Sequence, residues 1–163
     1  MTIAEYLRSG EFLRFVDETL RRNACDAVDR YLHENDKPAA KAQVYAIPAM
    51  LQARGPQGLE KLAANQVAKD EIAAPIKDLW QRIGDIIKSV PGPNDDLTLR
   101  NLVIKELQEH QLLLEETGRK ERKENRERLE QVLAHSVGPY FEHFVCHYFF
   151  RYRRPHREQP HEP

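Results

Sequence analysis

Residues 140–152, with the sequence YFEHFVCHYFFRY, hold seven aromatic side chains in thirteen positions. The apolar side chains of this stretch fall at i, i+3, i+4, i+7, i+8 and i+11, which is the spacing of one continuous face of an α-helix. So regular a stripe predicts a helix that buries this face, either in the chain's own core or in a subunit interface. The candidate interface residues are Phe141, Phe144, Tyr148, Phe149 and Tyr152.

The same helical spacing extends through most of the chain, and no stretch alternates apolar and polar residues for long enough to predict a strand. Residues 2–5 have the form of a capping box that begins a first helix, and Gly10 is expected to end it. Further helices are expected over about 11–33, after Pro38, over about 74–90, from Leu97 to near Gly118, and over about 140–153.

Glycine and proline divide these helices. Breaks are expected at 54–58, 91–96 and 137–139, and Pro48 is expected to kink or split the helix that contains it. One of Asn94, Asp95 and Asp96 is expected to cap the helix after the second break. The sequence therefore predicts an all-α bundle of about six to eight helices. We expect one helical domain over 1–154, or two lobes over 1–90 and 97–154, followed by a disordered tail over 155–163.

Composition limits the class of protein. The 163 residues include 25 Lys and Arg and 26 Asp and Glu, so the net charge is −1. This balance excludes a uniformly basic nucleic-acid binder, and any charged site must come from local segregation. The two cysteines, Cys25 and Cys146, are far apart, and the first residues contain no signal-like apolar run. With no stretch of about 18 apolar residues either, we expect a reduced, cytoplasmic protein without a membrane span.

Charge is segregated toward the C-terminal end of the chain. Residues 119–128 hold six basic residues and three glutamates, a net of +3, whereas 105–116 hold one lysine and four glutamates, a net of −3. The basic run is either a solvated helix face or mobile loop, or a surface that contacts phosphates. On the second interpretation, the residues expected to contact nucleic acid are Arg54, Arg119, Lys120, Arg122, Lys123, Arg126, Arg151, Arg153 and Arg154.

Two patterns suggest other chemistry. His143, Cys146 and His147 have the spacing of metal ligands on one helix, but a metal site needs a further ligand, and packing residues explain them as well. Arg128 and His135, with six residues between them, resemble the Arg-x4–6-His motif of HEPN-type ribonucleases, although Leu129 stands where that family favours a polar residue. That resemblance implies metal-independent RNA cleavage. No nucleotide-binding glycine pattern or hydrolase motif is present, and we expect no cofactor.

Two segments resemble a known family. Residues 39–62, through Tyr45, Pro48, Gly55 and Gly58, are similar to a helix–turn–helix region of the small helical subunits of type III CRISPR–Cas effector complexes. The segment 140–152 is similar to the aromatic helix that ends such subunits. The resemblance implies a non-catalytic subunit that stacks with its neighbours and lines the channel for guide RNA and target RNA. Its partners would be other protein subunits and the RNA phosphate backbone, with possible self-association.

Three functions therefore stay open at the level of sequence. The first is the non-catalytic subunit of a ribonucleoprotein that the resemblance implies. The second is a small HEPN-like ribonuclease that uses Arg128 and His135. The third is a helical adaptor or homo-oligomeric interaction protein that binds no nucleic acid.

Overall fold

A computed structural model describes residues 1–88 and 98–152, and this part of the chain is helical without any strand. The all-α prediction is therefore confirmed. The predicted break at 91–96, the predicted tail at 155–163, and Arg153 and Arg154 lie outside the described residues. None of the described helices combines the length and the apolar content that crossing a membrane requires.

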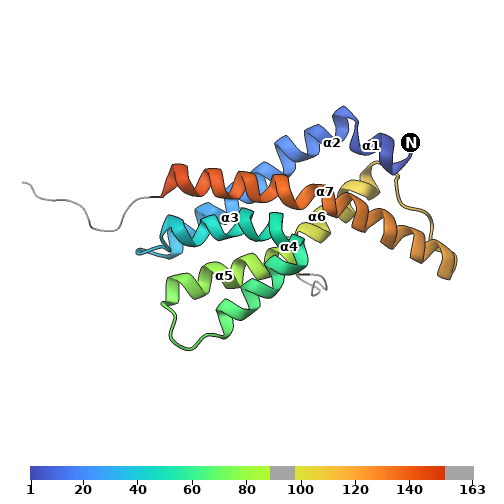
Figure 1. Cartoon of the computed structure of the whole chain (residues 1–163). Helices are drawn as coiled ribbons and strands as arrows, with labels where there is room; N and C mark the ends of the chain where they lie inside the picture. The colour runs from blue at the N-terminus through green and yellow to red at the C-terminus, as the bar shows by residue number, and fades with distance from the viewer. Residues whose placement is uncertain (89–97, 153–163) are drawn as a thin grey trace, which may run out of the picture.

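The helices form an elongated bundle (Figure 1). In chain order they are α1 (Ile3–Leu7), α2 (Gly10–Arg14), the π-helical η1 (Phe15–Leu20), α3 (Arg21–Glu34), α4 (Lys41–Ala68), α5 (Ala74–Ile87), α6 (Leu99–Glu109) and α7 (Arg119–Arg151). Because α2, η1 and α3 follow one another without a gap, they make one continuous rod. Counted in this way, the described chain has six helical rods, in agreement with the predicted six to eight.

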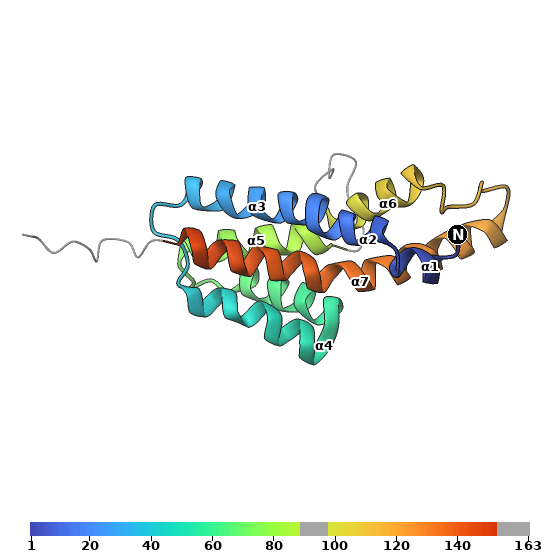
Figure 2. The ribbon, with the colours of Figure 1, turned by 90° about the horizontal axis from the view of Figure 1, so that it is seen from above.

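Helix α7 is the centre of the bundle. Its 33 residues make a rod of about 50 Å. Figure 2 shows α7 between the α2–α3 rod and α4, and it also contacts α1 and α6. Its buried side chains recur every three or four residues along its length, so one face covers the core throughout. They are Asn125, Leu129, Val132, Ser136, Val137, Tyr140, Phe141, Phe144 and Tyr148.

The start of the chain follows the predicted capping box. The backbone N–H of Glu5 donates to Thr2 Oγ1 at 3.1 Å, and the N–H of Thr2 donates to Glu5 Oε2 at 2.8 Å. The prediction that Gly10 ends this helix was wrong, because Gly10 is the first residue of α2. Ser9 caps α2 by accepting the N–H of Phe12, because a serine hydroxyl is among the best N-cap acceptors.

Helix α4 bends at Gly55 and not at Pro48. Gly55 has φ 70° and ψ −171°, and it is the only residue inside α4 with non-helical backbone angles. The prediction that Pro48 splits the helix was therefore wrong, whereas the predicted break at 54–58 is confirmed. Figure 1 shows the second half of α4 turning back from the first half at this bend.

The second half of the chain differs most from the predictions. The side chain of Thr98 caps α6 by accepting the N–H of Asn101 at 3.2 Å, whereas the predicted caps Asn94, Asp95 and Asp96 lie outside the described residues. Helix α6 ends at Glu109, much earlier than predicted, and Gln111 has φ 56°. The charged run 119–128, for which the sequence left helix and loop open, is helical.

Helix α7 also passes through Gly138 and Pro139 without a break, so the break predicted at 137–139 was wrong. Because Pro139 has no backbone N–H, the carbonyl of His135, four residues earlier, lacks its helical hydrogen bond. His135 is exposed, so water can bond that carbonyl. Val137, two residues before the proline, and Tyr140, the residue after it, are buried in the core and hold the helix in place.

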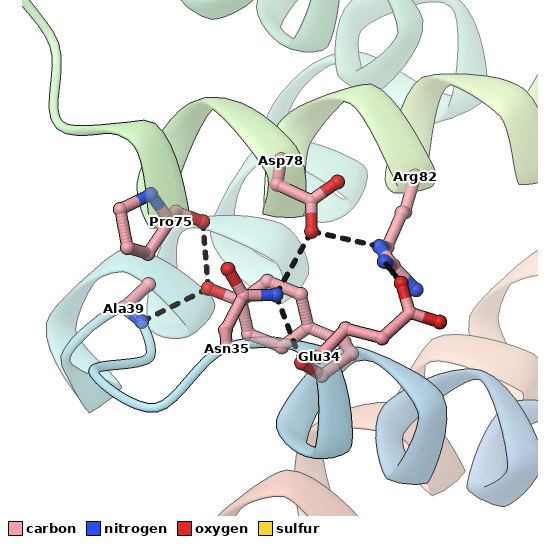
Figure 3. Close-up of polar contacts among 7 residues, drawn as sticks. Glu34, Asn35, Ala39, Pro75, Asp78 and Arg82 are labelled. Atoms are coloured by element: carbon pink, nitrogen blue, oxygen red, sulfur yellow. Dashed lines mark hydrogen bonds and ion pairs between the residues drawn. The ribbon is translucent and has the colours of Figure 1, made fainter.

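A polar cluster joins α3 to the starts of α4 and α5 (Figure 3). The buried hydroxyl of Tyr31 donates to the Pro75 carbonyl at 2.6 Å and accepts the N–H of Ala39 at 3.0 Å. The side-chain amide of Asn35 donates to Asp78 at 2.9 Å, and Arg82 Nε donates to the same carboxylate at 3.0 Å. These contacts link the ends of three helices, so we assign the cluster to stability.

This cluster makes the free energy of unfolding depend on pH. Burial alone would raise the pKa of Asp78, but hydrogen bonds from Asn35 and Arg82 and the charge of Arg82 hold this pKa below its ordinary value. A carboxylate with a lowered pKa in the folded state stabilises the fold above its unfolded pKa, and this contribution disappears as the pH falls through the folded pKa.

We therefore expect Asp78→Asn to lower the free energy of unfolding at pH 7 by about 1 kcal/mol, because the carboxylate is partly exposed and its contacts are screened. In urea titrations between pH 2 and pH 7, the gap between the Asp78→Asn variant and the parent should close as the pH falls below about 4. Asp70→Asn, at an exposed aspartate, is the matched control. A gap that stays constant over this pH range would contradict the assignment.

Candidate nucleic-acid interface

The first two turns of α7 carry basic side chains on one face. Arg119, Arg122, Lys123 and Arg126 stand at i, i+3, i+4 and i+7, and Lys120 lies beside them. All five side chains are exposed. We call these five residues the basic face.

The glutamates of the same segment are used differently. Glu121 accepts a hydrogen bond from the Thr117 hydroxyl at 2.7 Å, and Glu124 accepts from Arg128 Nε at 3.1 Å. Glu127 is exposed. By contrast, no side chain of the basic face has a hydrogen-bond or ion-pair partner in the part of the chain that the structure describes. The segment with a net charge of +3 therefore has five exposed cations without side-chain partners among the described residues, two carboxylates that are engaged by Thr117 and Arg128, and one exposed carboxylate, Glu127.

The electrostatics of the helix oppose this arrangement. The N-terminus of a helix carries the positive end of its macrodipole, so each cation in the first turn costs about 0.3–1 kcal/mol. Gly118, the residue before α7, supplies no side-chain cap. Helix stability does not account for five cations here, whereas a bound anion would relieve both the dipole and the mutual repulsion of the cations.

Two side chains on the opposite face fix this end of α7. Asn125 is buried, donates to the Leu114 carbonyl at 2.9 Å and accepts the Leu114 N–H at 2.8 Å. Arg128 Nη1 donates to the Leu112 carbonyl at 2.7 Å. These bonds hold the segment between α6 and α7 against the helix, so the basic face is presented on an anchored support.

The same contacts bear on the ribonuclease motif. The guanidinium of Arg128 is engaged by the Leu112 carbonyl and by Glu124. His135 lies two turns further along α7, is exposed, and its Nδ1 is 2.9 Å from the Gln131 carbonyl of its own helix. The two residues share a side of the helix, but Arg128 serves as a structural contact.

The other predicted phosphate contacts do not join the basic face. Arg151 is exposed at the opposite end of α7, about 48 Å along the helix axis from Arg119. Its Nε lies 3.6 Å from Asp29 of α3. Arg54 is exposed at the bend of α4. The structure therefore divides the predicted nucleic-acid residues among three places.

The aromatic stripe lies mainly inside the bundle. Phe141, Phe144 and Tyr148 are buried in the chain's own core, so they are not available to a partner. Phe149 and Tyr152 are partly exposed, and the ammonium of Lys41 lies 5.5 Å and 5.7 Å from their ring centres. Only these last two interface candidates remain accessible.

The predicted metal ligands line an open groove of about 800 Å³ between η1–α3 and α7. His147 Nε2 is 2.8 Å from Asp29 Oδ1, and Cys146 is exposed. In residues 1–88 and 98–152, no three His, Cys, Asp or Glu side chains are placed to hold a metal ion. Across the same groove, burial and the nearby Asp29 raise the pKa of the Cys25 thiol.

Arg54 and Lys61 both line an open hollow at the bend of α4. The sequence predicted a role for Arg54 but not for Lys61. The sequence signal for this hollow was the pair Gly55 and Gly58, because two glycines around a proline allow helices to approach closely.

Comparison of the chain with protein-family models, with curated proteins and with solved structures finds no match.

Proposed function

We propose that this chain is a non-catalytic helical subunit of a ribonucleoprotein that binds an RNA phosphate backbone through the basic face of α7. One observation carries the proposal: five exposed cations without partners share one face, while two glutamates of the same segment are paired. Lysine and arginine that neutralise phosphates release condensed counterions, which is the main source of sequence-independent affinity for nucleic acid.

The dimensions of the basic face suit this role. From Arg119 to Arg126 the helix rises about 10 Å, which is enough for two or three consecutive phosphates of one strand. The resemblance of 39–62 and 140–152 to small subunits of type III CRISPR–Cas effector complexes suggests the kind of assembly. In such an assembly the chain would lie along the channel for guide RNA and target RNA. A helical adaptor without nucleic acid is the alternative that the following experiment separates.

Neutralising the face by Arg119→Gln, Arg122→Gln, Lys123→Gln and Arg126→Gln is expected to remove most of the salt dependence of RNA binding. Each phosphate of a single strand that the protein neutralises contributes about 0.7 to the slope of log K against log salt, so two or three phosphates contribute about 1.4–2.1. A slope of that size means an affinity loss of about 7- to 20-fold between 50 and 200 mM salt for the unmodified protein. Fluorescence anisotropy with a labelled RNA measures both quantities.

A matched control carries the same loss of charge elsewhere. Arg30→Gln, Lys37→Gln, Lys69→Gln and Lys105→Gln neutralise four exposed cations on other parts of the surface. This variant should keep the slope of the unmodified protein. Equal losses in the two variants would mean that net charge, and not the basic face, determines binding. An unmodified protein that binds no RNA would favour the adaptor.

A further inference from the structure

We propose that the hollow at the bend of α4 is a binding site for a single nucleotide. The turn at Gly55 sets residues 41–54 and 56–68 at an angle to each other (Figure 1). An open hollow of about 450 Å³ is lined by residues from both parts. This volume lies in the range of small-molecule sites. The hollow is separate from the basic face, and the inference does not depend on the function proposed above.

The side chains that line the hollow supply each kind of contact that a nucleotide uses. Arg54 and Lys61 are cations for a phosphate. Gln57 and Asn65 are amides, which offer a donor and an acceptor together and so match the edge of an adenine. Among the described residues these four side chains have no hydrogen-bond or ion-pair partner.

The floor of the hollow is apolar. Met50 and Leu62 are half-buried and pack against the core, so their outer surfaces can lie against the face of a base. The described lining holds no carboxylate, and its formal charge is therefore +2. An apolar floor with amides and two cations favours a ligand that combines a flat ring with an anion.

Two glycines form the site before any ligand arrives. Gly55 makes the turn, and Gly58 lets the two halves of α4 approach closely. A Cβ atom at position 58 would lie 2.3 Å from the Cβ of Arg54 and 3.4 Å from the sulfur of Met50. Since both Arg54 and Met50 line the hollow, its shape depends on this close approach. A pre-formed site loses less entropy on binding.

The test is a titration of the full chain with adenosine monophosphate, followed by amide chemical shifts in ¹⁵N–¹H NMR spectra. We expect shifts centred on Arg54, Gln57, Lys61 and Asn65, and weaker binding of inorganic phosphate or adenosine alone. The variants Arg54→Gln and Lys61→Gln should each lower the affinity for the nucleotide about tenfold. Lys69→Gln, at an exposed lysine outside the hollow, should leave it unchanged.

A nucleotide within an RNA strand has the same chemistry, so a second arm uses a short oligoadenylate. If Arg54→Gln and Lys61→Gln weaken only the oligoadenylate, the hollow takes one unit of a strand. If they weaken the free nucleotide, it takes a mononucleotide. If they weaken neither, the proposal is wrong. The variant with a neutralised basic face should still bind the free nucleotide, so failure of the proposed function is distinguishable from failure of this site.

Discussion

Replacing Phe141 with alanine is expected to lower the free energy of unfolding by about 3–5 kcal/mol. Phe141 is 1% exposed, and its ring lies against Tyr140 at 5.1 Å and Phe144 at 5.7 Å between ring centres. The loss combines the transfer energy of the ring with the cost of the cavity that remains. Since single domains are stable by about 5–15 kcal/mol, urea unfolding should show a large shift of the midpoint.

Phe150→Ala is the matched control for this experiment. It removes the same side chain from the same helix, but Phe150 is 74% exposed, so the expected change is within about 0.5 kcal/mol. The pair also separates a core from a subunit interface. If Phe141 were covered by a second subunit, the effect of its replacement would depend on protein concentration. A small effect, or one that varies with concentration, would contradict its place in the core.

The aromatic stripe shows what periodicity can predict. The spacing of residues 140–152 was sufficient to predict a helix and the face that is buried. It could not show what covers that face, because a period records only which side of a helix is apolar. Tyr148 illustrates the difference: its hydroxyl donates to the carbonyl of Ala39, a contact between residues 109 apart in sequence that no local pattern encodes.

Proline and glycine positions predicted the ends of helices less well than apolar spacing predicted the helices themselves. Pro48, Gly138 and Pro139 lie inside continuous helices, because packing on both sides stabilises the helix by more than one lost hydrogen bond costs. The helical state of the charged run 119–128 depends partly on Asn125, whose amide bonds Leu114 in the preceding segment. A stretch of ten residues without an apolar side chain could not reveal that contact.

The candidate site was predictable only in part. The positions of Arg119, Arg122, Lys123 and Arg126 at i, i+3, i+4 and i+7 can be read from the sequence once the segment is known to be helical. That Arg151 lies far from them, and that Arg54 shares a hollow with Lys61, follows from the length of α7 and from the bend at Gly55. Charge segregation identified the residue types, and tertiary structure decides which of them act together.

Gly55→Ala is expected to lower the free energy of unfolding by about 1–3 kcal/mol. With φ 70° and ψ −171°, Gly55 occupies a backbone region that is almost exclusive to glycine. A Cβ added at this position would meet no atom within 4 Å, so crowding contributes nothing and the whole cost comes from backbone strain. Thermal or urea unfolding of the single variant measures it.

Gly84→Ala is the matched control, because the same substitution should have the opposite sign there. Gly84 lies inside α5, and its added Cβ would lie 3.6 Å from the Cβ of Ala63, which is an ordinary van der Waals contact. Alanine in a helix interior is more favourable than glycine by about 0.5–1 kcal/mol, since glycine loses more backbone entropy on folding. A stabilised Gly84→Ala beside a destabilised Gly55→Ala would support the bend in α4. Equal destabilisation at both positions would mean that the added methyl group, and not the backbone of Gly55, causes the loss, and a neutral change at Gly55 would contradict the bend on which the hollow depends.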